Sequence, residues 1–149
     1  MITHNAQETI QAGIDFAKKL HGREILALTG DLGSGKTTFM KGLAEGLHVN
    51  ETITSPTFVL LKPYQGQINN RKIELVHIDA YRIDTIEDIK SVGIEDYLDR
   101  DDIVLAIEWA EKIKEILPVL PASGPKNMIQ LNFRNIDENT REITNDFVD

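Results

Sequence analysis

The chain has 149 residues, enough for one domain with a sizeable hydrophobic core, and we expect a single domain over residues 1–149. Hydrophobic residues make up 41% and charged residues 27%, as in globular proteins, and no apolar run approaches the length of a membrane span. The absence of cysteine excludes a disulfide framework and a thiolate zinc site, and it is compatible with the cytoplasm, where we expect the protein.

The net charge of −8 is concentrated in one segment. Within residues 84–102, eight acidic side chains stand against only Lys90 and Arg100. Such a surface repels the nucleic-acid backbone, so we expect no tight direct binding of DNA or RNA. Two interpretations remain: a solvated face that keeps the protein soluble, or a docking surface for a basic partner.

In chain order, Asn5 and Glu8 predict the start of a helix whose apolar stripe runs to Leu20. Residues 25–29 are a short apolar run of strand length. After a glycine-rich loop, apolar residues recur at helical spacing and predict a second helix over residues 36–47. The order strand, glycine loop, helix is therefore expected near the N-terminus.

The loop at residues 30–37 reads G-x-x-x-x-G-K-T, the P-loop pattern. Its glycines let successive backbone N–H groups surround phosphate oxygens, and the following helix adds the positive end of its dipole. Lys36 is expected to reach the phosphates and Thr37 to join the Mg²⁺ shell. A chance match in a glycine turn is the alternative, and the flanking strand and helix argue against it. The residues expected to surround the phosphates are Asp31, Leu32, Gly33, Ser34, Gly35, Lys36 and Thr37.

Residues 52–57 form a hydroxyl-rich loop in which Pro56 forces Ser55 into an extended conformation. Residues 58–64 and 73–79 read as strands around a turn at 65–71, an antiparallel hairpin. The later elements are a helix over 86–98 interrupted by Gly93, a strand at 103–107 apolar enough to be buried on both faces, a short helix over 110–117 stopped by Pro118, a strand at 128–133, and a last short strand at 141–144. Together they predict an α/β P-loop NTPase with a central mixed, mainly parallel sheet flanked by helices.

A P-loop site needs a carboxylate for Mg²⁺ at the end of a strand beside the P-loop strand. Asp79 and Glu108 compete for this role. Because the strand before Glu108 is wholly apolar, as a central parallel strand should be, we expect Glu108 to be the metal-side carboxylate. Asp79 receives a catalytic or switch role, and either residue could instead be an exposed acid at a strand end.

Several other residues carry weaker signals. Thr57 is either a switch residue that bonds Mg²⁺ or the γ-phosphate, or an ordinary turn threonine. His77 reads as a packed strand residue, and Arg82 as a surface arginine that could stabilise transition-state charge. Trp109 is placed among the nucleotide-binding residues, although packing is its ordinary chemical role. No Asn-Lys-x-Asp stretch, the guanine-reading motif, occurs in the chain, which favours ATP over GTP.

Four blocks resemble the TsaE (YjeE) family, the small bacterial ATPases of tRNA threonylcarbamoyladenosine synthesis. They are G-D-L-G-S-G-K-T-T at residues 30–38, S-P-T-F at 55–58, H-I-D-A-Y-R at 77–82 and E-W at 108–109. Their order and spacing cover roughly residues 7–110. The P-loop alone is generic, whereas His-x-Asp-x-Tyr-Arg followed by Glu-Trp is far more specific.

The resemblance implies ATP binding by the P-loop, including Thr38, and Mg²⁺ held by Thr37 and Glu108. It places Asp79 at the family's functionally sensitive acid, Thr57 in a first switch and residues 77–82 in a second. It also implies that residues 6–9, including Thr9, and a late arginine, here Arg141, approach the nucleotide. A solvated arginine on an edge strand is the alternative for Arg141. Lys36, Asp79 and Thr57 are the expected catalytic residues.

The resemblance further implies an ATP-driven factor for the TsaD–TsaB heterodimer, whose TsaD subunit modifies the adenosine beside the tRNA anticodon. Slow hydrolysis is expected of the protein alone, because partners often complete such sites. Two alternatives remain open. A small-molecule kinase is disfavoured by the acidic, arginine-poor segment after the hairpin, and a nucleotide-gated binding module would use the same residues as an ATPase.

Overall fold

The computed structural model describes residues 1–55, 60–116 and 127–148. Its elements follow one another in the order β1 (Ile2–Thr3), α1 (Ala6–Ala17), β2 (Glu24–Thr29), α2 (Lys36–Gly46), β3 (Leu61–Ile68), β4 (Arg71–Asp79), α3 (Ile86–Ser91), α4 (Glu95–Leu98), β5 (Ile103–Glu108), the 3₁₀ helix η1 (Ala110–Lys112), β6 (Asn127–Asn135) and β7 (Arg141–Val148). No helix in these described ranges is long and apolar enough to cross a membrane.

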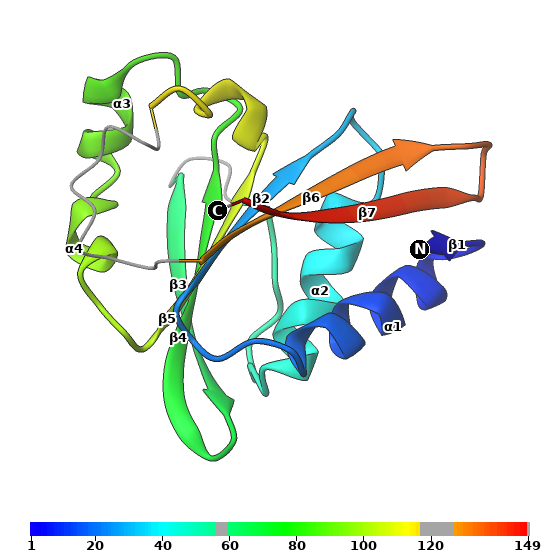
Figure 1. Ribbon diagram of the computed structural model, residues 1–149, viewed down its shortest axis with the longest axis horizontal. Helices are drawn as coiled ribbons and strands as arrows, with labels where there is room; N and C mark the ends of the chain where they lie inside the picture. Colours follow the sequence, from blue (N-terminus) through cyan, green and yellow to red (C-terminus); the bar gives the residue numbers. More distant parts are fainter. Residues whose placement is uncertain (56–59, 117–126, 149) are drawn as a thin grey trace.

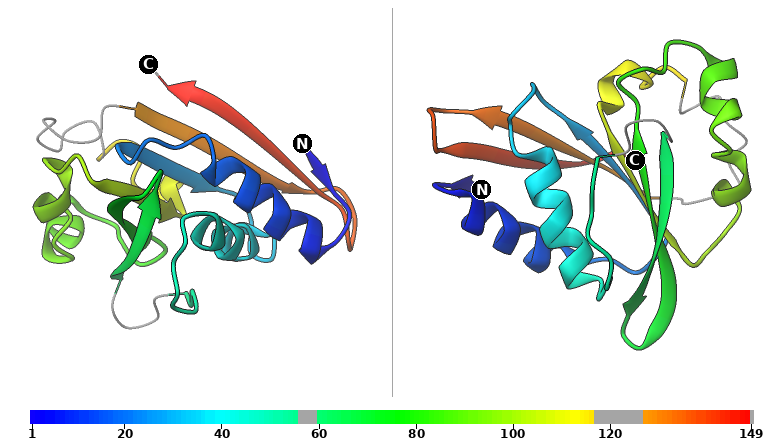
Figure 2. Two further views of the ribbon diagram at one scale, coloured as in Figure 1. Left: turned by 90° about the horizontal axis from the view of Figure 1, so that it is seen from below. Right: turned by 180° about the vertical axis from the view of Figure 1, so that it is seen from behind.

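The strands form one sheet in the order β1-β7-β6-β2-β5-β4-β3. The four inner strands β6, β2, β5 and β4 run parallel, whereas β3, β7 and β1 pair antiparallel at the edges. The β6–β7 hairpin with β1 forms one edge of the sheet and the β3–β4 hairpin forms the other; Figure 2 shows the N-terminal strand beside the orange and red β6–β7 hairpin. The expected fold class, a mixed and mainly parallel sheet flanked by helices, is confirmed.

The sheet separates two hydrophobic layers. One buried cluster joins α1 and α2 to one face of the sheet, and a second joins α3, α4 and the segment after β5 to the other face. In Figure 1, α1 and α2 accordingly lie together on one side and α3 and α4 on the other. Because β5 lies between these layers, all six of its residues are buried, as its continuous apolar run predicts.

α1 and α2 pack closely because glycines replace side chains at their contact. A Cβ atom on Gly42 would lie 1.9 Å from the Ile10 carbonyl oxygen, and one on Gly13 would lie 2.3 Å from the Phe39 carbonyl oxygen. The ring of Phe39 meets Phe16 edge-on at a centroid distance of 5.7 Å. This tight pair holds α2, and with it the loop that precedes α2, in a fixed place on the sheet.

The hairpin is longer than the sequence predicts. The turn expected over residues 65–71 is confined to Asn69 and Asn70, both with positive φ, and β3 continues through Gly66 to Ile68. Gly66 is required by packing and not by a turn, because a Cβ atom there would lie 2.7 Å from the Leu47 carbonyl oxygen. The two asparagines provide the left-handed conformations that a two-residue hairpin turn needs.

Two further expectations need correction, and one short strand was not predicted. The helix expected over residues 110–117 is the 3₁₀ helix η1 followed by turns as far as residue 116, and the position of residue 117 lies outside the described ranges. β7 extends beyond residue 144 to Val148 because its backbone stays paired with β6. The two-residue strand β1, which pairs with Glu142 and Arg141, is too short to give a periodic pattern. The interruption at Gly93, with φ +84°, separates α3 from α4 as expected.

Candidate nucleotide-binding site

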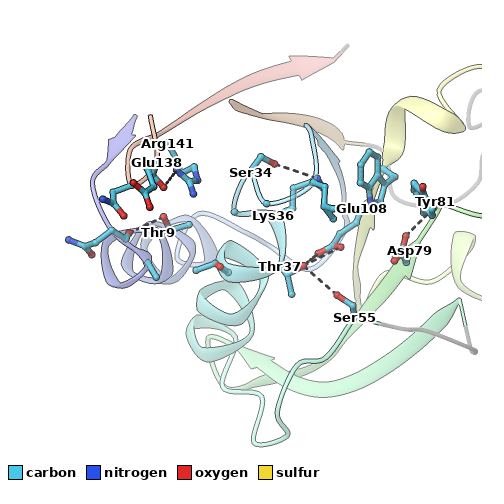
Figure 3. Close-up of a pocket in the computed structure, with 18 residues that line it drawn as sticks. Thr9, Ser34, Lys36, Thr37, Ser55, Asp79, Tyr81, Glu108, Glu138 and Arg141 are labelled. Atoms are coloured by element: carbon cyan, nitrogen blue, oxygen red, sulfur yellow. Dashed lines mark hydrogen bonds between the residues drawn. The ribbon is translucent and has the colours of Figure 1, made fainter. Parts of the chain in front are cut away.

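A cavity of about 610 Å³ opens where β2, β4 and β5 end and α2 begins (Figure 3). The carboxyl ends of parallel strands meet there, which is where α/β sheets commonly bind ligands. Its walls come from the start of α1, the glycine loop, the ends of β4 and β5, and the β6–β7 turn. The residues that line it are Asn5, Ala6, Thr9, Leu32, Gly33, Ser34, Gly35, Lys36, Thr37, Thr38, Ser55, Asp79, Tyr81, Glu108, Trp109, Glu138, Asn139 and Arg141.

The glycine loop has the geometry of an anion cradle. Gly33 and Gly35 have φ values of +75° and +101°, a conformation that side chains disfavour. A Cβ atom on Gly33 would meet nothing within 4 Å, so the space beside the backbone at this residue is open. Gly35 precedes the first residue of α2, and no described side chain caps this helix start. The unpaired N–H groups of a helix start favour a negatively charged ligand.

Lys36 points into the loop at the start of α2. Its ammonium group donates to the carbonyl oxygens of Gly30 and Asp31, the latter at 2.9 Å, and lies 4.2 Å from the centre of the Trp109 ring. Burial lowers the pKa of the Lys36 ammonium from its ordinary value, although the carboxylate of Glu108 acts in the opposite direction. The charge is thus held by carbonyl dipoles and an aromatic face, and it is positioned beside the open cradle.

Oxygen atoms from three elements meet beside the loop. The Thr37 hydroxyl donates to the Glu108 carboxylate at 3.1 Å and lies 3.4 Å from the Ser55 hydroxyl (Figure 3). The residues are brought together because β5 is the direct neighbour of β2. Hard oxygens suit Mg²⁺, which usually keeps several waters and takes only one or two protein ligands. The described residues contain no cluster of three or more His, Asp and Glu side chains that could hold a metal ion.

Asp79 ends β4 directly opposite Glu108, the residue that ends β5. Its carboxylate accepts a hydrogen bond from the Tyr81 N–H at 3.0 Å, and both residues line the cavity. The two carboxylates that compete for the metal in the sequence therefore lie on adjacent strands at the same edge. Glu108, and not Asp79, is the one bonded to Thr37.

Trp109 follows Glu108 in an unusual backbone conformation. Its φ of 59° is left-handed, which is rare for a large side chain and costs free energy. The ring lies between the Lys36 ammonium and the ring of Tyr81, whose centroid is 5.1 Å away. The contacts with Lys36 and Tyr81 hold the indole at the cavity wall in spite of the strained backbone.

At the opposite end of the cavity, α1 meets the β6–β7 turn (Figure 3). The Thr9 hydroxyl donates to the Asn5 carbonyl oxygen at 3.2 Å and is 2.8 Å from the Thr3 hydroxyl. The Arg141 guanidinium donates to carbonyl oxygens of its own turn, including that of Glu138 at 3.1 Å. Residues far apart in the sequence thus close this end.

Most of the expected site residues line the same cavity. Asp31 does not line it and contributes its carbonyl oxygen to Lys36 instead, and Arg82 does not line it either. Thr57 lies outside the described residues, so its expected switch role stays a prediction. Ser55, Glu138 and Asn139, to which the sequence assigns no role of their own, also line the cavity, as does Tyr81 from the expected second switch. Ser55 and Tyr81 belong to recognisable blocks, whereas Glu138 and Asn139 follow a strand without any motif.

Comparisons with known proteins agree on one family. The model of the family described as "Threonylcarbamoyl adenosine biosynthesis protein TsaE" matches residues 3–143. A tRNA threonylcarbamoyladenosine biosynthesis protein TsaE from Treponema pallidum is 34% identical over 143 residues, 96% of each chain. One from Bacillus subtilis is 36% identical, with 81% of this chain and 68% of the relative aligned. The crystal structure of Bacillus subtilis YdiB has a TM-score of 0.70 and 32% identity, and the match covers 97% of this chain and 82% of that one.

Proposed function

Because the chain belongs to the TsaE family, we propose that it is a P-loop ATPase that takes part in threonylcarbamoylation of tRNA adenosine. One observation carries this proposal more than any other. The open glycine cradle, the Lys36 ammonium, and the Thr37–Glu108 oxygen pair lie together in one cavity. These are the three groups that binding of a magnesium-bound triphosphate requires: backbone amides, a cation for phosphate oxygens, and oxygen ligands for the metal.

In this proposal the loop from Gly33 to Thr38 binds the phosphates through its N–H groups. Lys36 turns from the carbonyl oxygens of Gly30 and Asp31 toward the phosphate oxygens. Thr37 and Glu108 hold Mg²⁺, which would neutralise phosphate charge when bound. The fit rests on the donor set described above, a hydroxyl and a carboxylate 3.1 Å apart at the start of a helix.

Asp79 is proposed to orient or deprotonate the attacking water. Its carboxylate lines the cavity beside Glu108, and the Tyr81 N–H fixes one of its oxygens at 3.0 Å. Among the described cavity residues, no imidazole and no glutamine competes for this role. Hydrolysis by the protein alone is expected to be slow, because no strong water activator beyond Asp79 is evident among the described cavity residues and partners often complete such sites.

The partner of this proposal is the TsaD–TsaB complex. The segment between Asp79 and α3 leaves the cavity directly, and Tyr81 on it is 57% exposed, so a change at the phosphates could reach the surface here. Nucleotide-dependent ordering of such segments is a common way to control a partner. The acidic surface of the following helices agrees with a protein that assists a tRNA-modifying enzyme without holding the RNA itself.

The first test compares Lys36→Ala with Asp79→Ala. We expect Lys36→Ala to weaken ATP binding by ~100-fold or more, since it removes charge-assisted hydrogen bonds. We expect Asp79→Ala to bind ATP nearly as the wild type does while losing turnover by ~100-fold, the usual contribution of a general base. Titration calorimetry with Mg²⁺ and ATP measures binding, and phosphate release measures turnover, each with and without TsaD and TsaB.

Matched controls are Lys41→Ala, on the same helix but outside this cavity, and Asp96→Ala in the acidic segment. Both are expected to bind and hydrolyse ATP as the wild type does in the measurements without TsaD and TsaB. Near-wild-type binding and turnover in both test variants would contradict the site assignment. If the protein captures TsaD and TsaB only with nucleotide but releases no phosphate, it is a nucleotide-gated binding module and not an ATPase.

A further inference from the structure

His77 is a buried polar residue without a partner, directly beneath the metal-side carboxylate. Its side chain is fully buried, and neither ring nitrogen has a hydrogen-bond partner among the described residues. Its Nε2 atom lies 3.6 Å from Oε1 of Glu108, slightly beyond hydrogen-bond distance. Buried polar groups without partners destabilise a fold and are rare, so this one requires an explanation.

The sheet determines which way His77 faces. His77 is paired with Ala106 of β5, and Glu108 lies two residues further along the same strand. Because side chains two residues apart share a face, all three lie on the face covered by α1 and α2. A leucine at position 77 would complete this apolar layer without leaving a polar atom unpaired, so packing alone does not account for histidine here.

Glu108 is contacted through the same oxygen by two groups. Oε1 accepts a hydrogen bond from the Thr37 hydroxyl at 3.1 Å and is 3.6 Å from the His77 ring. In the described part of the chain, Thr37 is the sole hydrogen-bond donor to this carboxylate. If Thr37 and Glu108 both turn toward a cation, His77 is the group that remains in place to hold the carboxylate.

We propose that His77 is a positioning residue for Glu108: its Nε2–H donates to the Glu108 carboxylate and orients it toward the metal. The inference rests on the proposed function, because it concerns the same metal site. A shift of the carboxylate by a few tenths of an ångström would convert the 3.6 Å contact into a hydrogen bond. Groups that orient a metal ligand in this way raise the affinity for the metal without touching it.

The experiment measures how much Mg²⁺ strengthens ATP binding, together with the stability of each protein. Calorimetric titrations with ATP are carried out in Mg²⁺ and in EDTA, and unfolding is followed in urea. We expect His77→Leu to weaken binding in Mg²⁺ by about tenfold, as loss of such a supporting group typically does, and to leave binding in EDTA unchanged. Its stability should equal or exceed that of the wild type, because the unpaired polar atoms are gone.

Two variants separate positioning from packing. His77→Gln keeps an N–H donor near the same position and should recover part of the Mg²⁺ effect. Tyr64→Phe is the matched control, since the Tyr64 hydroxyl is the other buried side-chain group without a partner in the described residues, on the adjacent strand β3. It should change neither titration. If His77→Leu does not fold, His77→Phe, which is closer in shape, provides the same comparison.

The possible results are distinct. If Mg²⁺ strengthens ATP binding by the same factor in His77→Leu as in the wild type, this inference is wrong and the proposed function stands. An equal loss of affinity in Mg²⁺ and in EDTA has the same consequence, because it would indicate a packing role. A wild-type protein that binds ATP equally with and without Mg²⁺ overturns the metal site of the proposed function and this inference with it. A loss confined to Mg²⁺ and partly restored by glutamine supports it.

Discussion

At the scale of single residues, the glycines of the P-loop serve two different purposes. Gly30 is required by the fold, because a Cβ atom there would lie 2.4 Å from the Phe133 carbonyl oxygen. Gly33 has open space around its Cα, so the fold requires only its positive φ of +75°. The free space beside Gly33 is therefore available to a ligand. A substitution at Gly30 should mainly affect folding, and one at Gly33 should mainly affect binding.

We expect Gly33→Ala to cost about 1 kcal/mol of stability, the strain of a left-handed alanine, and to weaken ATP binding by about tenfold or more because a methyl group enters the cradle. Gly30→Ala should cost about 3 kcal/mol or more, since clash and strain add. Urea unfolding and calorimetric titration measure both quantities. A Gly33→Ala protein that binds ATP as the wild type does would show that this part of the loop does not face the phosphates.

The sequence predicts the P-loop side of the cavity from its own motifs, whereas Thr9 and Arg141 on the other side are expected only through the family resemblance. Lys36 and Thr37 lie in a motif whose spacing reflects a mechanism, and Glu108 follows a strand apolar enough to be recognised as central. Glu138 and Asn139 reach the cavity only because β6 and β7 bring their turn next to α1. Such a contact depends on tertiary structure and leaves no local pattern in the sequence.

At the scale of elements, the contact between α1 and α2 fixes the P-loop. Alanine is usually favoured over glycine within a helix by about 1 kcal/mol. At Gly42 this preference is reversed by packing, because the added Cβ atom would lie 1.9 Å from the backbone oxygen of Ile10. Backbone atoms cannot rotate away as a flexible side chain does, so the two helices would have to separate.

We expect Gly42→Ala to destabilise the protein by about 2 kcal/mol despite its better helix propensity, because overpacking outweighs propensity. Lys41→Ala, on the exposed side of the same helix, should change stability by less than about 0.5 kcal/mol. The free energies of unfolding in urea provide the comparison. An increase in stability for Gly42→Ala would mean that the helices are not in close contact at this position.

Elements with a strong local pattern are predicted well from the sequence, and those that exist through strand pairing are not. The buried run of β5 and the break at Gly93 follow from local sequence. The sequence predicts a turn at Gly66, whereas in the structure this glycine gives space to a neighbouring backbone, and the two kinds of glycine look the same in a sequence. β1 and the end of β7 exist through their partners' hydrogen bonds, which no short window of sequence reveals.

At the scale of the whole molecule, the cavity joins parts of the chain that are distant in sequence. Its walls include Asn5 from the N-terminal end and Arg141 from the last strand, with the P-loop and the end of β5 between them. A ligand that fills the cavity therefore contacts the edge of the sheet that carries β7 as well as its centre. Binding should stabilise the native state as a unit, since the unfolded chain brings none of these groups together.

This argument gives a quantitative expectation for thermal unfolding. A ligand present at 100 times its dissociation constant stabilises the native state by about 2.7 kcal/mol. For a domain of this size, each kcal/mol raises Tm by roughly 2–4 °C, so Mg²⁺ with ATP should raise Tm by about 5–10 °C. Removal of Mg²⁺ by EDTA at the same ATP concentration should reduce the Tm shift, because Thr37 and Glu108 then have no metal ion to bind.

Scanning calorimetry of the wild type and of Lys36→Ala tests this expectation. The variant should show nearly no shift at the same ATP concentration, because the ammonium that faces the phosphates is absent. An equal shift in both proteins would mean that the nucleotide stabilises the fold from somewhere other than the P-loop. A Tm shift that EDTA leaves unchanged would instead mean that the cavity binds the nucleotide without Mg²⁺. The measurement therefore tests nucleotide binding and metal binding separately.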